Sequence, residues 1–156
     1  MLLTFDQLKD YRGRVAMVDG AFDPLHRGHI EYFRSAAEAK DFSAIEEIFS
    51  ADVVFRSPVV FKPYEGRDAV AALLAAVVQV FEDFRYTDQV ETGDAAALAF
   101  SARVGDREVD GIDFLRFDGD GMVTELAVYV RPLSGINALA EAMQRKLEEM
   151  GAPTGS

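Results

Sequence analysis

The sequence predicts an α+β fold in which helices cover one face of a curved antiparallel sheet. Turn signals at 92–94, 104–106 and 118–121 divide residues 84–131 into four strands of about ten residues, a spacing typical of an antiparallel meander. Apolar residues recur at helical spacing both before and after this stretch. Helices that accompany a meander in this order pack against it, which gives a two-layer fold.

The hairpin at 112–132 is the segment around which the other elements are arranged. Apolar and polar residues mostly alternate on both sides of its Asp-Gly-Asp-Gly turn, and Pro132 ends the second strand. Counting outward from the three turns gives the four expected strands, which are 84–91, 95–103, 107–117 and 122–131.

Helical patterns occupy much of the remaining chain. A helix is expected over 29–40, and the capping-box spacing at 43–46 predicts a second, short helix that ends at Phe49. The strongest amphipathic pattern predicts a helix over 67–83, and a terminal helix is expected over 136–147. The other expected segments are a buried strand at 15–18, a strand at 52–58 with a return at 59–61, and a disordered tail at 151–156.

The composition limits the class of protein. A chain of 156 residues, 49% of them hydrophobic, is expected to be one domain with its own core, and it contains no cysteine. The net charge of -11 argues against a nucleic-acid surface or an anionic membrane surface, because either needs a clustered basic face. The longest apolar run, 69–78, is far shorter than the ~20 residues that cross a bilayer. We therefore expect a cytoplasmic domain that binds a small molecule and needs no metal or cofactor.

Asp113 is the strongest candidate for chemistry. It shares a strand face with Leu115 and Phe117, because residues two apart point to the same side of a sheet. If this face lines an apolar cavity, desolvation raises the pKa of the carboxyl group, and the protonated acid can donate to an oxygen that gains charge. The alternative is a solvated or hydrogen-bonded carboxylate on the strand. Among the tyrosines, Tyr64 and Tyr86 are assigned to packing.

Three stretches carry a family resemblance: AEAKDFSAIEEIFSADVVFRSP, EGRDAV at the start of the long helix, and IDFLRFDGDG in the hairpin. From about residue 30 to residue 150 they resemble the SnoaL-like branch of the nuclear transport factor 2-like superfamily. The resemblance implies a cone-shaped pocket, a small apolar or amphipathic ligand, and a homodimer. Members include polyketide cyclase-like enzymes, isomerases, dehydratases and non-catalytic binders. The residues expected to line the pocket with Asp113 are Phe33, Phe55, Ser57, Leu115, Phe117 and Tyr129.

Within this superfamily, Asp113 is similar in position to the protonated aspartate of ketosteroid isomerase. The same resemblance places Ser57 at the position of the general base and Phe33 at the position of the tyrosine donor. A serine without a basic partner cannot take a proton from carbon, and phenylalanine cannot donate to an oxyanion, so steroid-type isomerisation is not expected. A relative of the epoxide hydrolases would need a second carboxylate and an arginine, for which the candidates are Arg56, Arg116 and Arg131.

The segment GAFDPLHRGH at 20–29 holds both histidines of the chain. It resembles the HxGH signature of cytidylyltransferase-like nucleotidyltransferases, which implies that His26, Gly28 and His29 hold nucleotide phosphates at a helix N-terminus. The other parts of that family do not follow Ala37. We interpret residues 1–28 as an extension left by truncation, fusion or design of a chimera, followed by a SnoaL-like domain at 29–150.

The leading interpretation is a small-molecule-binding domain with isomerase, cyclase or hydrolase chemistry through Asp113. The alternatives are a non-catalytic ligand-binding or dimerisation module and a nucleotidyltransferase that uses the HxGH loop. For the homodimer, we expect Phe100 and Val104 or their neighbours on an exposed sheet face, since apolar strand faces without a covering helix tend to pair.

Overall fold

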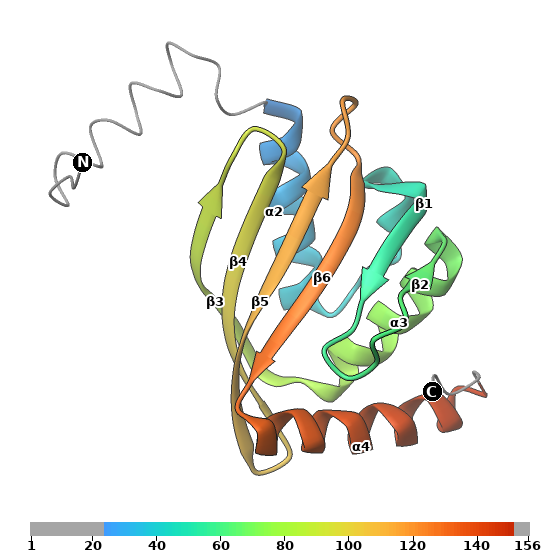
Figure 1. Ribbon diagram of the computed structural model, residues 1–156, viewed down its shortest axis with the longest axis vertical. Coiled ribbons are helices and arrows are strands. Elements are labelled where there is room, and N and C mark those ends of the chain that lie inside the picture. The colour runs from blue at the N-terminus through green and yellow to red at the C-terminus, as the bar shows by residue number, and fades with distance from the viewer. Residues whose placement is uncertain (1–23, 152–156) are drawn as a thin grey trace, which may run out of the picture.

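The computed structural model describes residues 24–151, which form a six-stranded sheet with helices packed against it (Figure 1). The α+β fold expected from the sequence is confirmed. In chain order the elements are α2 (Pro24–Ala39), η1 (Ile45–Glu47), β1 (Phe49–Arg56), β2 (Tyr64–Glu65), α3 (Arg67–Val80), β3 (Glu82–Glu91), β4 (Ala95–Val104), β5 (Arg107–Phe117), β6 (Val123–Arg131) and α4 (Leu133–Glu149).

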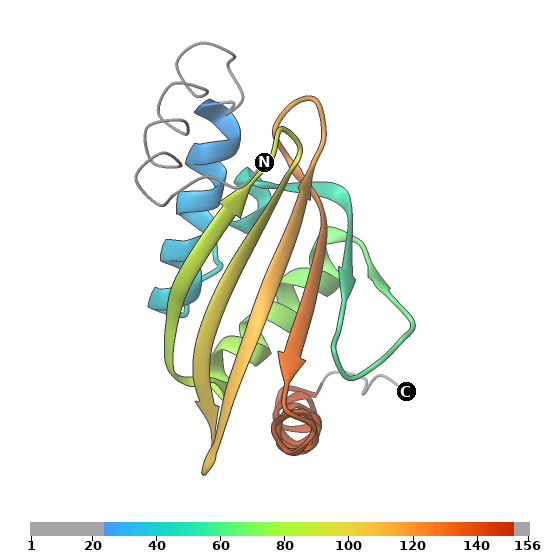
Figure 2. The ribbon, with the colours of Figure 1, turned by 60° about the vertical axis from the view of Figure 1, so that its left-hand side comes forward.

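The sheet is a meander with two further strands on one edge. Its strand order is β2-β1-β6-β5-β4-β3, and neighbours are antiparallel except for β1 and β6, which are parallel. The predicted hairpins β3–β4, β4–β5 and β5–β6 are all present. The sheet is curved, with α2 and α3 against one face and α4 across one end (Figures 1 and 2). The face covered by α2 and α3 is termed the inner face, and the opposite one the outer face.

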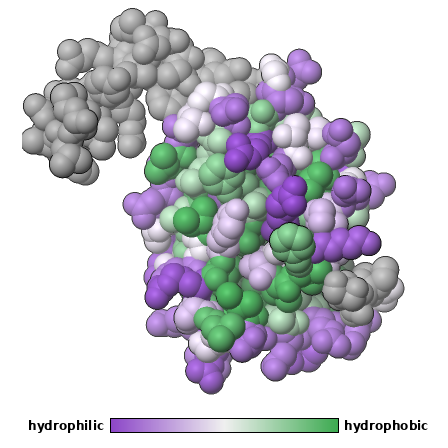
Figure 3. Space-filling model, in the orientation of Figure 1, coloured by the Kyte–Doolittle hydropathy of each residue, from purple (hydrophilic) through white to green (hydrophobic). Residues whose placement is uncertain are grey.

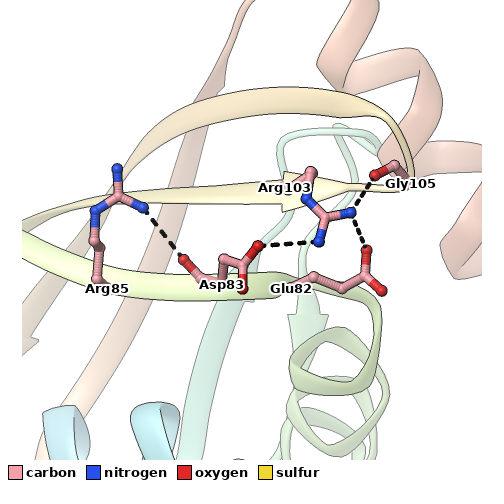
Figure 4. Close-up of polar contacts among 5 residues, drawn as sticks. All are labelled: Glu82, Asp83, Arg85, Arg103 and Gly105. Atoms are coloured by element: carbon pink, nitrogen blue, oxygen red, sulfur yellow. Dashed lines mark hydrogen bonds and ion pairs between the residues drawn. The ribbon is translucent and has the colours of Figure 1, made fainter.

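Two bulges interrupt the pairing of β3 with β4. Thr87 and Asp83 each stand as an extra residue in the register. Asp83 has a left-handed backbone, with φ of 53°. The guanidinium group of Arg103 holds this region, because it donates to the carboxylates of Glu82 and Asp83 and to the carbonyl of Gly105 (Figure 4). Each bulge shifts the alternation of β3 by one residue and so changes which of its side chains point inward.

The hydrophobic core has two parts. The larger lies between the inner face and the helices α2 and α3, and the smaller includes Phe81, Phe100 and Val104 with Leu139 of α4. The prediction that Phe100 and Val104 lie on an exposed face is wrong, because they are only 2% and 4% exposed. They alternate in phase with the buried Leu98 and therefore point inward.

Some element boundaries differ from the sequence prediction. The helix α2 begins at Pro24, earlier than expected, because proline fits the first turn of a helix. The expected capping box does not form, since the backbone N–H of Ser43 donates to the Asp41 carboxylate and only the short η1 follows. The return strand lies at Tyr64–Glu65 rather than at 59–61.

The predicted strand at 15–18 and nearly all of the tail at 151–156 lie outside the described residues. Within residues 24–151, no helix combines the length and apolar character that crossing a membrane requires. The same residues contain no cluster of histidine, aspartate and glutamate side chains that could hold a metal ion.

Candidate functional site

Asp113 lies on the inner face near the middle of the sheet. It belongs to β5 and pairs with Leu98 of β4 and Val128 of β6. The side chain is buried, with 7% of the residue exposed, and no other carboxylate among residues 24–151 is buried to this degree. The burial expected from strand alternation is therefore confirmed.

A cavity of about 280 Å³ lies beside Asp113, enclosed by the inner face, the helices and the segment 57–60. Most of its wall is apolar, and its aromatic part consists of Phe33, Phe42, Phe55, Phe81 and Phe84 together with Tyr64. The polar side chains in the wall are Ser57, Tyr64, Asp113 and Gln144, and no basic side chain of the described residues lines it. Such a cavity suits an apolar ligand with few polar groups.

Tyr86 of β3 is the hydrogen-bond partner of Asp113. Its hydroxyl group donates to Oδ2 of Asp113 at 2.8 Å, whereas Oδ1 accepts no hydrogen bond from the described residues. Burial raises the pKa of Asp113 to about 7, and the hydrogen bond from Tyr86 acts in the opposite direction because it favours the carboxylate. Burial and the nearby Asp113 carboxylate raise the pKa of Tyr86 well above its ordinary value. At neutral pH, Tyr86 therefore remains a donor while Asp113 exchanges between acid and carboxylate.

Comparison with known protein families identifies the domain to which most of the described chain belongs. Residues 30–126 match the SnoaL-like domain, a range that contains Asp113, Tyr86 and the β1 wall of the cavity. The chain belongs to the SnoaL-like family. Among curated proteins, no relative matches this SnoaL-like chain.

Solved structures of the same fold include two with substantial sequence identity. A steroid delta-isomerase from Pseudomonas aeruginosa is 40% identical, with a TM-score of 0.81, and the match covers 85% of this chain and 98% of that one. An uncharacterised protein with a cystatin-like fold from Silicibacter pomeroyi DSS-3 is 32% identical, with a TM-score of 0.74 and coverage of 77% and 85%. An epoxide hydrolase/cyclase-like enzyme of pyran ring formation in salinomycin shares the fold at 17% identity, with a TM-score of 0.58 and coverage of 70% and 92%.

The SnoaL-like cavity brings Asp113 together with Phe33, Phe55 and Ser57, as the sequence predicts for its lining. The hydroxyl group of Ser57 accepts the backbone N–H of Val59 at 3.0 Å and has no basic partner among the described residues. The other two members of the Asp113 face, Leu115 and Phe117, are buried in the larger core instead of lining the cavity.

Tyr129 lies elsewhere, which corrects the prediction that it lines the cavity. It is on the outer face, 61% exposed, beside a separate shallow depression that Arg56 and Phe61 also line. Its neighbour Val128 is the β6 residue that reaches the cavity, because adjacent strand residues point to opposite faces.

Tyr64 and Tyr86, which are predicted from the sequence to be packing residues, are the two tyrosines that reach the site. Tyr64 lines the cavity, and Tyr86 bonds Asp113. Without the bulge at Thr87, strand alternation would pair Tyr86 with Ser101 and turn it outward; with the bulge, Tyr86 pairs with Phe100 on the inner side. No local sequence signal marks this bulge, and the sequence therefore does not reveal that Tyr86 reaches the site.

The three arginines considered for an epoxide-hydrolase arrangement do not line the cavity. Arg56 and Arg116 both pair with Glu125, and Arg131 pairs with Asp110 at 3.2 Å. Asp113 is also the only carboxylate among the described lining residues. The second carboxylate and the arginine that such a mechanism needs are therefore not part of this cavity.

The HxGH residues lie in the first turns of α2. Nδ1 of His29 donates to the carbonyl of Gly121 at 2.5 Å, which ties α2 to the β5–β6 turn. Residues 20–23 of the signature lie outside the described residues. The implied phosphate-binding role of His26, Gly28 and His29 stays a prediction.

Proposed function

We propose that this SnoaL-like domain binds a small, largely apolar molecule and that Asp113 acts as an acid on an oxygen atom of that molecule. The observation that carries the proposal is the buried carboxyl group of Asp113 in the wall of an apolar cavity, where burial raises its pKa to about 7. A group with such a pKa is half protonated at neutral pH and can both give and regain a proton there. The 40% identity to a steroid delta-isomerase supports an apolar ligand of this kind.

The cavity favours acid assistance over isomerisation with a separate base. A protonated Asp113 donates to a ligand oxygen, and the hydrogen bond strengthens as that oxygen gains negative charge. Epoxide opening of this kind uses one carboxyl group and differs from the two-carboxylate arrangement, which the described lining of this cavity lacks. The Asp113 proton moves to the oxygen as the C–O bond breaks, water adds to the carbon, and the proton that the water loses restores the acid. Ser57 does not supply a base, because its hydroxyl group has no basic partner among the described residues.

A non-catalytic binding module is the second candidate. It is favoured by one observation, namely that the described lining holds a single carboxyl group and no histidine or lysine. One group serves one proton transfer at a time, which restricts the chemistry to simple acid assistance. Ligand binding through Asp113 is common to both candidates, and turnover separates them.

A matched pair of naphthalenes tests the binding. In 2-acetylnaphthalene a carbonyl oxygen accepts a hydrogen bond, and in 2-isopropenylnaphthalene a CH2 group takes its place. At pH 6 we expect calorimetry to show about five- to tenfold tighter binding of the ketone, an advantage that disappears by pH 8.5 as Asp113 ionises. Asp113→Leu should abolish the advantage. Asp110→Asn, on the outward side of the same strand, should keep it. An advantage of equal size in Asp113→Leu would overturn the proposal.

The epoxide 2-(2-naphthyl)oxirane tests for turnover. Diol formation above the uncatalysed rate that is lost in Asp113→Asn supports the acid role, with Asp110→Asn again as the control. Binding without any diol formation supports the non-catalytic module and removes the acid role.

A further inference from the structure

Tyr86 contacts Asp113 from β3, which lies two strands away from β5 in the sheet. It does not line the cavity, yet its hydroxyl group reaches Oδ2 of Asp113 at 2.8 Å. Its ring makes edge contacts with Phe84 and Phe100, at 4.9 Å and 6.4 Å between ring centroids and interplanar angles of 89° and 87°. The guanidinium group of Arg34, on α2, lies 5.3 Å from the ring centroid. The ring is thus fixed on several sides.

The Arg34 side chain is itself held in place. It donates to Oε1 of Gln89 on β3 at 2.9 Å and lies 4.0 Å from the Glu38 carboxylate one helical turn away. A continuous set of contacts therefore runs from α2 through the Tyr86 ring to the carboxyl group in the cavity.

The hydrogen bond decides where the acidic proton of Asp113 resides. Among the described residues the Tyr86 hydroxyl group donates to Oδ2 and to no other acceptor. If the proton sat on Oδ2 and pointed at Tyr86, the tyrosine hydrogen would lose its acceptor in a buried place, which costs about 1–3 kcal/mol. The proton is therefore favoured on Oδ1, the oxygen that is left for the cavity.

We propose that Tyr86 is a positioning residue of this site, which holds Oδ2 so that the protonated Asp113 presents its acidic hydrogen to the cavity through Oδ1. This inference rests on the proposed function, since it concerns how the acid is aimed. The bulge at Thr87 makes this role of Tyr86 possible, because without the extra residue the Tyr86 side chain would point to the outer face.

The charges around the pair are few. Arg34 and Glu38 of α2 face Tyr86, and the Arg34 charge lowers the pKa of Tyr86 whereas the Glu38 charge raises it. On the cavity side, Tyr64 of β2 is the only other titratable group in the described lining. Substitution of Tyr86 should therefore change the titration of Asp113 chiefly through the lost hydrogen bond.

Tyr86→Phe keeps the ring and removes the donor. In a ligand-free pH titration followed by the 13Cγ signal of Asp113, we expect the midpoint to move upward by about one pH unit, because the bond that favours the carboxylate is gone. In calorimetry at pH 5.5, where Asp113 is protonated in both proteins, the preference for 2-acetylnaphthalene over 2-isopropenylnaphthalene should fall severalfold. Tyr129→Phe, which also removes a tyrosine hydroxyl group but one on the outer face without a bond to Asp113, should leave the midpoint unchanged.

The two readouts separate failure of this inference from failure of the proposed function. If neither naphthalene binds, the proposed function fails, and the ligand-free midpoint still shows whether Tyr86 acts on Asp113. An unchanged midpoint together with an unchanged ketone preference in Tyr86→Phe would overturn the positioning role. If Tyr86→Phe does not fold, Arg34→Gln tests the same set of contacts. We expect this variant to lose less of the preference for the ketone than Tyr86→Phe would, and an unchanged preference would contradict the positioning role.

Discussion

Asp113 destabilises the folded chain once it ionises. Its pKa is about 7 in the fold and close to 3.8 in the unfolded chain, so between these values the folded chain keeps a proton that the unfolded chain has lost. The free energy of unfolding therefore falls as pH rises from about 4 to 7 and then stays low. The full difference is about 4 kcal/mol, a large fraction of the stability of a domain this size.

Asp113→Asn should remove this dependence while it retains an acceptor for Tyr86. Relative to the natural chain, the variant should gain about 2 kcal/mol in free energy of unfolding between pH 5.5 and pH 8.5. Urea denaturation at the two pH values measures this change, and Asp110→Asn serves as the control because its carboxylate is exposed. Parallel pH dependences for the natural chain and Asp113→Asn would show that the carboxyl group is not desolvated.

At this scale the sequence identifies Asp113 because strand alternation alone places it on the apolar face with Leu115 and Phe117. It does not identify Tyr86, because a single extra residue at Thr87 reverses the alternation along β3. The sequence prediction places Tyr129 in the cavity wrongly, because the register of β6 decides which of its side chains face the cavity, and residue type does not reveal that register.

The elements fit together through close contacts that depend on small residues. Gly111 of β5 lies opposite Phe100 of β4. A Cβ atom at this position would lie 2.3 Å from Cζ of Phe100 and 2.6 Å from the backbone oxygen of Tyr129. The aromatic ring covers the glycine, so β5 offers no room for a side chain at this point.

Gly111→Ala should therefore lower the free energy of unfolding by about 1–3 kcal/mol through overpacking. Gly93→Ala is the matched control, because a Cβ atom there meets nothing within 4 Å. Adding Phe100→Leu should restore part of the loss, although the contact with the Tyr129 carbonyl remains. Equal stability of the two alanine variants in urea denaturation would contradict the close approach.

Element types and the meander are predictable because turns and periodicity are local signals. The short helix predicted from the capping box is an exception, because another local contact competes with it. The Asp41 carboxylate accepts the backbone N–H of Ser43 that the capping box would have used. The pairing of β1 with β6 is parallel and joins distant parts of the chain, and periodicity carries no information about such a partner.

On the scale of the whole molecule, the outer face combines an apolar centre with charged margins. Figure 3 shows apolar side chains over much of the sheet and hydrophilic ones around it. Residues that pair across neighbouring strands form two mainly apolar rows on this face. One row consists of Ala99, Ile112 and Tyr129, and the other of Val90, Ala97, Phe114 and Ala127. The adjoining rows carry ion pairs, Arg116 with Glu125 and Arg131 with Asp110. This arrangement resembles the core and rim of a protein interface.

We propose that a second copy of the chain covers this face. Light scattering at high micromolar concentration should give twice the chain mass, and Ile112→Arg should give a monomer, because it places a charge in the apolar centre. Asp52→Asn, at an exposed position outside these rows, is the control and should remain a dimer. A monomeric natural chain would refute this proposal.

Nucleotidyl transfer is not expected, in spite of the HxGH signature. The described chain after α2 forms a mostly antiparallel sheet rather than consecutive β-α-β units, and the net charge of -11 disfavours a triphosphate. Incubation with CTP or ATP, magnesium and phosphorylated alcohols should release no pyrophosphate above background. Release that disappears in the His26→Ala/His29→Ala double variant would establish the activity.

The central claim is that Asp113 is an acid poised near neutral pH inside an apolar cavity, and its own titration tests this most directly. With aspartate labelled at 13Cγ, comparison with Asp113→Asn assigns the Asp113 signal, and the chemical shift of that signal is followed from about pH 3 to pH 9. The structure predicts a midpoint of about 7 for Asp113. A midpoint at or below the ordinary value of about 3.9 would show a charged, solvated carboxylate and contradict the acid role.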